Sequence, residues 1–401
     1  NYITMMASSS SSSDSYSRSG SWGVLLVWVL AVSFVKDCQS WSLPIFAATA
    51  GAVSFVSSDV SSGVAGGRRV VAVAGATGRT GRYVVQELLE RGVEVVALVR
   101  DEEKAVQMFA DAADDQLLTV IKCDLLSKNE VTKATRNCDA AIWCATGFSS
   151  ADNGMMAKFQ SLFSLVTKRT IDQIGVPLLA QTINKNNNNN NNLPQMIMCS
   201  SAGVTRPSWD EDKKEAFSGC ADIPIVRLNP FGILDLKRES EQSLRDINVP
   251  YCIVRPCGLQ DDENVWKSNS RPVLSQGDVA VGRIHRKDVA NILVDCCLQL
   301  NESTGKTFEV SSIEGNNYPP PKTLSPILQS MTNDSVQGEP YIPSSPVLQA
   351  TYSALQQLLP GEKQDAAALA MGQTYEQLDN DQVGRLGERG QESIEEAGIY
   401  K

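Results

Sequence analysis

The chain has 401 residues, of which 42% are hydrophobic and 20% are charged, as in ordinary globular proteins. Lys and Arg number 36 against 46 Asp and Glu, so the net charge is −10. Because nucleic acid and anionic lipid surfaces are bound chiefly through surplus Lys and Arg, we expect neither as a partner.

Cysteine and histidine do not form a metal-binding pattern. The ten cysteines contain no Cys-x-x-Cys pair, and His285 is the single histidine. Structural zinc needs clustered cysteines and histidines at short spacings, so we predict no metal site. The cysteines scatter along apolar segments, which favours buried, reduced thiols over disulfides.

Residues 1–67 are predicted to be a targeting presequence. The apolar run 23–35 follows Arg18, and its thirteen residues are too few to span a bilayer, so it indicates a secretory-type signal. Residues 41–67, which follow the expected cleavage point, hold one acid and no base. This arrangement resembles the bipartite presequence of algae with secondary plastids. It implies the plastid (chloroplast) stroma and no transmembrane span in the mature protein; a plain secretory signal is the alternative.

From residue 68 to residue 325, short apolar runs rich in β-branched residues alternate with helical patterns. The runs are apolar on both faces, which is typical of parallel strands covered by helices on each side. We therefore predict one α/β domain, a doubly wound Rossmann-type parallel sheet. Strands are expected at 68–75, 93–100, 117–125, 138–147, 196–204 and 251–259, and helices include 79–91, 171–183 and 234–246.

A glycine triplet follows the first expected strand and precedes the first helix. Gly75 allows a tight turn, Gly78 lets the backbone approach a pyrophosphate, and Gly81 lets the helix pack closely on the strand. The helix N-terminus then faces the phosphates. This order predicts a dinucleotide-binding loop; a Rossmann domain that has lost its ligand is the alternative. The predicted contacts are Gly75, Thr77, Gly78, Arg79, Thr80 and Gly81.

The end of the second strand favours NADP(H) over NAD(H). NAD-binding folds usually place an acid there for the ribose 2′-hydroxyl, but this chain has Arg100. Arg100 and Arg79 could together clamp a 2′-phosphate, since guanidinium matches phosphate oxygens. Asp101 is expected instead to cap the helix that follows it.

Several motifs together resemble the atypical short-chain dehydrogenase/reductase family, especially its plastid and bacterial NAD(P)-binding branch with flavin and biliverdin reductases. They are GATGRTGRYVV, LVRD, CDL at 123–125, VRP at 254–256 and RKDVA at 286–290. The resemblance implies that Asp124 and Leu125 border the adenine, and that Ser200 and Ser201 lie beside the nicotinamide. It also implies that the middle of the cofactor is lined by Ala145, Thr146 and Gly147.

The family's catalytic Tyr-x-x-x-Lys is incomplete. Lys237 stands in the lysine position, but Ile233 takes the place of tyrosine, so the usual acid/base is absent. Three interpretations remain open: a reductase of flavin-like or quinone-like acceptors lined by Ser200, Ser201 and Lys237, a non-catalytic NADP(H)-sensing or assembly protein of the plastid, or an isomerase or dehydratase. Lys237 as a solvated residue of the run K-R-E-S-E is the structural alternative.

Three segments carry weaker signals. Seven asparagines at 186–192 are expected to be a neutral insertion, and residues 208–224 are expected to form either a lid or a surface loop. Residues 326–401 are predicted to comprise a linker, a helix that starts at Ser345 and stops before Pro360, and an acidic, partly disordered tail. His285, just before RKDVA, is expected to cap or pack.

Overall fold

The fold is known from a computed structural model that describes most of the chain beyond residue 68. The presequence expectation for residues 1–67 lies outside the described residues, as do the expectations for Gly147, for asparagines 187–192 and for most of the acidic tail. The described ranges are 69–110, 116–146, 171–186, 193–229, 232–261, 270–313, 319–335 and 338–359, with Leu369 and Leu378.

One eight-stranded sheet organises the domain, in the order β3-β2-β1-β4-β5-β6-β10-β8. All neighbours pair in parallel except β10 and β8, which are antiparallel. The doubly wound α/β prediction is confirmed, and the strand order reverses between β1 and β4, where such sheets bind ligands. The strands are β1 (Val70–Ala74), β2 (Glu94–Val99), β3 (Leu118–Lys122), β4 (Ala140–Trp143), β5 (Met196–Cys199), β6 (Tyr251–Pro256), β8 (Arg271–Ser275) and β10 (Lys306–Ile313).

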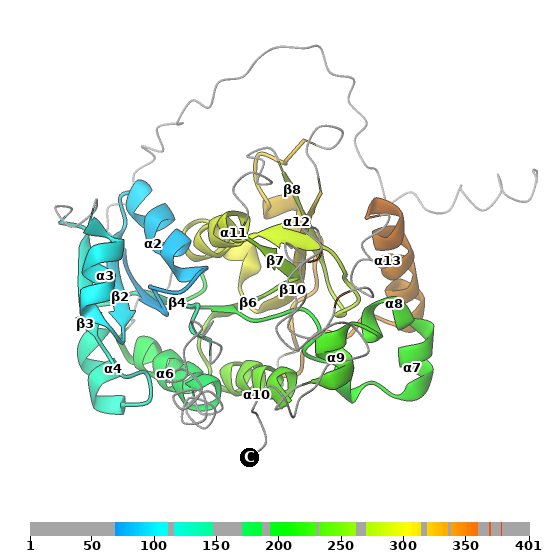
Figure 1. Cartoon of the computed structure of the whole chain (residues 1–401), viewed down its shortest axis with the longest axis horizontal. Helices are drawn as coiled ribbons and strands as arrows, with labels where there is room; N and C mark the ends of the chain where they lie inside the picture. The colour runs from blue at the N-terminus through cyan, green and yellow to red at the C-terminus, as the bar shows by residue number, and fades with distance from the viewer. Residues whose placement is uncertain are drawn as a thin grey trace, which may run out of the picture. The chain divides into compact units, whose positions relative to one another are not determined.

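Helices cover both faces of this sheet (Figure 1). Along β1, Val71 and Val73 join one apolar cluster with α2 and α11, whereas Ala72 and Ala74 join the opposite cluster with α4, α6 and α10. Both sets are completely buried, which is why the strand is apolar at every position. The helices are α2 (Gly81–Glu90), α3 (Glu102–Met108), α4 (Lys128–Ala134), α6 (Val176–Asn186), α10 (Ile233–Asp246) and α11 (Arg286–Leu298).

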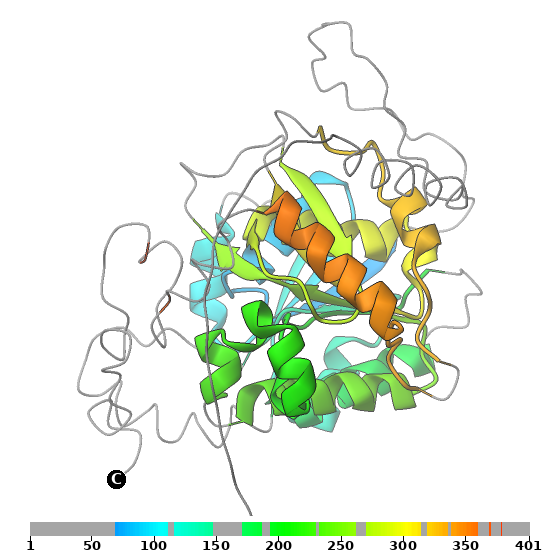
Figure 2. The same ribbon diagram turned by 90° about the vertical axis from the view of Figure 1, so that its right-hand side faces the viewer.

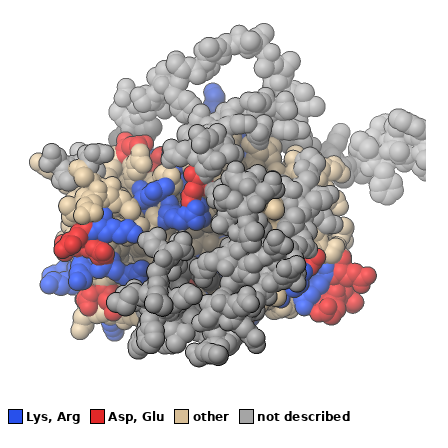
Figure 3. All heavy atoms as spheres, in the orientation of Figure 1, with Lys and Arg blue, Asp and Glu red and all other residues tan. Residues whose placement is uncertain are grey.

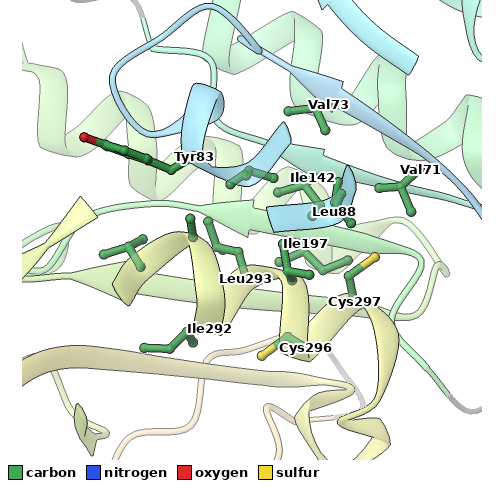
Figure 4. Packing of buried hydrophobic residues seen from close by; sticks show 14 of the residues in the cluster. Val71, Val73, Tyr83, Leu88, Ile142, Ile197, Ile292, Leu293, Cys296 and Cys297 are labelled. Carbon is green, nitrogen blue, oxygen red and sulfur yellow. The ribbon is translucent and has the colours of Figure 1, made fainter. Parts of the chain in front are cut away.

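The helices α2 and α11 pack together on one face of the sheet. Leu88 of α2 and Leu293 of α11 lie between the helices and the sheet, close to Ile142 and Ile197 (Figure 4). Cys297 points into the same packing, as the sequence prediction of buried thiols requires, and the described cysteines are free thiols. The two helices therefore fix each other's position, and their N-termini lie toward the same edge of the sheet.

The chain after β5 is helical rather than a plain loop. Arg206 is buried here, and its Nη2 lies 3.2 Å from Oδ1 of Asp278, the only acid it pairs with among the described residues. The same guanidinium donates to the carbonyls of Cys220 and Ala280. This segment, which includes the expected lid or surface loop, forms a 3-10 turn (Arg206–Ser208) and α7 (Glu211–Ala216), α8 (Ser218–Ala221) and α9 (Pro224–Leu228).

The C-terminal helix α13 (Ser345–Leu358) packs beside α7 and α8, as both views of the ribbon show (Figures 1 and 2). Tyr352 of α13 meets the ring of Phe217 at a centroid distance of 5.3 Å, and its hydroxyl accepts a hydrogen bond from the Gly219 N–H. The predicted helix is confirmed, but its N-cap is Ser344, which makes no side-chain capping hydrogen bond, and Ser345 is the first helical residue. α12 (Ser325–Ser330) lies earlier and buries Leu328 against the core of α2 and α11.

Two short strands and two irregular helices complete the description. β7 (Gly258–Gln260) pairs in parallel with β9 (Arg283–His285) as a second small sheet. The expected helix at 171–183 is instead a π-helical turn (Ile171–Gly175) followed by α6. A 3-10 turn (Asn301–Ser303) precedes β10.

The described surface is mixed in charge. Over the region of α2, α3 and α4, basic and acidic side chains are interspersed (Figure 3). Of the helices in the described ranges, none combines the length and apolarity needed to cross a bilayer.

Alanine at Gly75 tests the close approach of the glycine turn to β4. Gly75 has φ +76°, and a Cβ there would lie 2.6 Å from Cα of Ala145; Gly92 has a similar φ, +70°, with no atom within 4 Å. Both alanines carry left-handed strain of about 1–2 kcal/mol, and Gly75→Ala adds an overpacking cost of about 1–3 kcal/mol. Urea unfolding should therefore show the larger loss for Gly75→Ala. Equal losses would show that the end of β4 moves aside freely.

Candidate functional site

The glycine turn is built as the spacing predicts. The Gly78 N–H donates to the Gly75 carbonyl over 2.9 Å, which closes the turn. A Cβ on Gly81 would collide with that same carbonyl, so the first residue of α2 packs directly on the turn. At Gly78 the carbonyl of Gly75 is the nearest atom, 3.0 Å from a Cβ, and the remaining space is open to a ligand.

The N-terminus of α2 differs from those of the next two helices. Asp101 caps α3 by accepting from the Lys104 N–H over 3.0 Å, as predicted, and Ser127 caps α4. At α2, Thr80 makes no side-chain capping hydrogen bond, and the first turn contains no acid. The Arg82 and Tyr83 N–H groups donate to the carbonyls of Gly78 and Thr80, so the earlier N–H groups of this turn and the positive end of the helix dipole are what an anion could meet.

The two arginines that were expected to bind a 2′-phosphate lie in different environments. Arg100 is exposed at the end of β2. Arg79, on the glycine turn, forms an ion pair with Asp261, the residue that follows β7. The other oxygen of Asp261 lies 2.7 Å from Nη1 of Arg286, at the start of α11. The structure thus does not join Arg79 to Arg100; it joins Arg79 to Asp261.

The predicted adenine border lies at the end of β3. Asp124 organises the turn that follows the strand: its Oδ1 accepts from the Leu126 N–H over 3.0 Å, and its own N–H donates to Glu130. Leu125 is buried in the core against the α4 and α6 side of the sheet. Asp124 is therefore placed at the ligand edge, whereas the side chain of Leu125 serves packing.

The ends of β4 and β5 meet beside the glycine turn. Trp143 and Met198 are paired residues of the two strands, so Cys144 and Cys199 follow as lateral neighbours. Burial raises the pKa of the Cys199 thiol to about 11, against the opposing charge of Lys237. These thiols are therefore protonated at neutral pH. Next to Cys144, Ala145 is buried and Thr146 is exposed.

Lys237 reaches this junction from α10. Its side chain is 8% exposed, which rules out the solvated alternative. Within the described ranges no carboxylate forms an ion pair with its ammonium. Ile233, one turn earlier in the tyrosine position, is buried against Val204 and Val226. The lysine of the motif is therefore in place, and the apolar side chain of Ile233 occupies the position of the catalytic tyrosine.

Ser200 and Ser201 have separate roles. The Ser200 hydroxyl donates to Oε1 of Glu241 over 2.6 Å, and Glu241 also accepts from Arg255 and Arg245. Burial alone would raise the pKa of Glu241, but these guanidinium groups outweigh burial and hold it at about 2. Ser201 donates to the carbonyl of Ala202. The Ser200 oxygen is therefore fixed in place by an ionised carboxylate.

Three site-edge groups were not found from the sequence. Glu241 lies four residues after Lys237, so the helical repeat could have placed it on the same buried face. Arg286 lies within RKDVA, which was recognised as a motif but without a role. Asp261 gave no signal, because its partner Arg79 is far away in the chain. His285 caps α11 with Nδ1, as expected. No metal-ligand cluster occurs among the described residues.

Glu241→Gln tests the carboxylate behind Ser200. Ionised Glu241 stabilises the fold above its ordinary pKa of 4.5, and this contribution is lost as pH falls toward 2. At about pH 7 the variant should lose about 3–5 kcal/mol of unfolding free energy, because Arg245 and Arg255 each lose one of their buried charge partners. The loss should shrink at about pH 3.5. Glu239→Gln, on the exposed face of α10, makes the same charge change and should be near neutral; a pH-independent gap would contradict the role of ionisation.

Comparison with known proteins shows which family the chain belongs to. Residues 75–299 match the family model described as NAD(P)H-binding. An uncharacterised chloroplastic protein of Arabidopsis thaliana is 29% identical over 242 residues, which is 60% of this chain and 75% of that protein. Chloroplastic TIC 62 of Pisum sativum is 28% identical over 299 residues, covering 71% of this chain and 49% of TIC 62.

Among solved structures, an oxidoreductase of Lactococcus lactis is similar with a TM-score of 0.44 at 17% identity. The match covers 65% of this chain and 96% of that one. The family assignment rests on the model, whose matched residues hold the glycine turn, the ends of β4 and β5, and Lys237. The match covers more than half of the length of this chain, so the chain belongs to the NAD(P)H-binding family.

Proposed function

We propose that this chain binds NADP(H) across the carboxyl ends of β1, β4 and β5 and acts as an oxidoreductase that works without a catalytic tyrosine. The observation that carries the proposal is the buried side chain of Lys237, which lies beside these strand ends and whose ammonium has no carboxylate partner among the described residues. A ribose hydroxyl of a dinucleotide would offer this ammonium a hydrogen-bond acceptor.

Each site residue has a proposed part. Gly75, Thr77, Gly78, Thr80 and Gly81 would present backbone and hydroxyl groups to the pyrophosphate at the uncapped N-terminus of α2. Arg79 and Arg100 would contact the 2′-phosphate, and Asp124 and Leu125 would border the adenine. The middle of the cofactor would be lined by Ala145, Thr146 and Gly147. Ser200, Ser201 and Lys237 would lie toward the reacting end. NADPH, when bound, supplies the hydride.

The protein's own groups limit what the acceptor can be. The Ser200 hydroxyl donates its hydrogen bond to Glu241 and the Ser201 hydroxyl donates its hydrogen bond to a carbonyl, so neither hydroxyl is aimed at a substrate. The nearby thiols hold their protons strongly. The acceptor should therefore take its proton from solvent, as flavin-like and quinone-like compounds can, while Lys237 orients the ribose.

A non-catalytic plastid protein that senses NADP(H) or supports an assembly is the second candidate. Ile233 favours it, because an apolar side chain fills the position where the related enzymes need an acid. The similarity to TIC 62 is in keeping with it. The names of the chloroplastic relatives and the form of residues 1–67 support a location in the plastid stroma for either function.

Calorimetric titration with NADPH, NADP⁺ and NADH tests the cofactor proposal. NADPH should bind with a dissociation constant in the micromolar range, and more tightly than NADH. Gly78→Trp should abolish the signal by filling the open side of the turn, whereas Gln86→Trp, on the exposed face of α2, should leave it intact. Unchanged binding by Gly78→Trp would place the dinucleotide elsewhere.

Lys237→Met and a turnover assay separate the two candidates. Loss of a charge-assisted hydrogen bond should weaken NADPH binding about 10- to 100-fold, and Arg238→Met, on the exposed neighbouring position, should have little effect. An oxidoreductase must oxidise NADPH when offered flavins, quinones or carbonyl compounds. Saturable binding of NADPH and NADP⁺ without any turnover would leave the sensing or assembly function standing.

A further inference from the structure

Asp261 holds two arginines at the edge of the glycine turn. One carboxylate oxygen lies 2.7 Å from Nη1 of Arg286, and the other is paired with the Arg79 guanidinium. Arg79 comes from the turn between β1 and α2, whereas Arg286 opens α11. One acid thus connects the turn to the helix that packs beside α2.

Arg79 and Arg286, which both pair with Asp261, are held to different degrees. Gln260 is the paired residue of His285 across β7 and β9, so Asp261 and Arg286 follow as neighbours in that register. The Arg286 side chain is 10% exposed, but that of Arg79 is 47% exposed. An ion pair with so much solvent access is weak. Arg79 is therefore the partner that can exchange Asp261 for another anion.

The first turn of α2 offers no acid of its own, and its N-terminus lacks a side-chain cap. Asp261 is thus a negative charge brought by a distant segment to the place where a dinucleotide phosphate is expected. A bound phosphate would compete with it for Arg79 and would also be repelled by it.

We propose that Asp261 sets the affinity and the selectivity of the site for dinucleotide phosphate by competing for Arg79. This inference rests on the proposed binding of NADP(H) at the glycine turn. Binding requires Arg79 to exchange the carboxylate of Asp261 for a phosphate group, while Arg286 keeps Asp261 in place. A dinucleotide whose phosphate does not reach Arg79 does not make this exchange.

Asp261→Asn tests the competition, with affinities measured for NADPH and NADH by titration calorimetry. Asparagine keeps the shape and an acceptor for Arg286 but removes the charge. The dissociation constant for NADPH should fall about two- to fivefold, the range expected for a solvent-exposed ion pair. A gain confined to NADPH is expected and identifies the 2′-phosphate as the competitor. An equal gain for NADH would overturn the role in selectivity, because the competing group would be the pyrophosphate that both dinucleotides carry.

Asp295→Asn is the matched control. Asp295 of α11 pairs with Arg91 at the C-terminal end of α2, 2.6 Å apart and similarly exposed, and its loss changes the net charge equally. Its affinities should equal those of the wild type. In an Arg79→Gln background, Asp261→Asn should lose its effect. Asp261→Ser provides a second charge-removing variant, with the thermal midpoint of each variant checked first.

Unchanged or weaker NADPH binding by Asp261→Asn, beside normal binding by the wild type, overturns the competition and leaves the proposed function intact. A gain that persists without Arg79 also overturns it, because Asp261 would then act by general charge alone. A wild type that binds no dinucleotide overturns both proposals.

Discussion

The contact between the glycine turn and the end of β4 is the constraint on which the ligand edge depends. Gly75 lies so close to Ala145 that no side chain fits between them, and Gly81 lies against the carbonyl of Gly75. These approaches hold the N-terminus of α2 at the point where the strand order reverses. α2 in turn packs on α11, so the start of α11, with Arg286, is placed by the same contacts.

Much of the fold could be predicted because it depends on local pattern. β1 is apolar at each position since both of its faces are covered, and the glycine spacing follows from the turn itself. The cap at Asp101 and the start of α13 also follow from neighbouring residues. The strand β10, the antiparallel β8 and the second small sheet were not predicted. β7, β8 and β9 are short, and polar residues interrupt the apolar pattern of β10 (KTFEVSSI).

Individual residues of the site could be predicted from the sequence, but the ion pairs between their side chains were harder to predict. Lys237 and Ile233 could be placed from a spacing of four on one helix. The partner of Arg79 could not, because ion pairs between distant segments are fixed by tertiary packing and leave no mark on either segment. Burial was also hard to judge on α10, where K-R-E-S-E suggests a solvated face. Lys237 and Glu241 are nevertheless buried. Two arginines neutralise the charge of Glu241, and Lys237 lies beside the ends of the strands.

The packing of α13 on α7 and α8 also bears on the order in which the molecule is completed. The hydrogen bond between Gly219 and Tyr352 joins residues 133 positions apart. This contact can form only after the chain has been made through Tyr352. Until α13 has docked, Phe217 and Trp209 lack a large part of their apolar cover. A chain that emerges from its N-terminus can thus assemble the glycine turn and central strands early, while the helices after β5 wait for almost the last described segment.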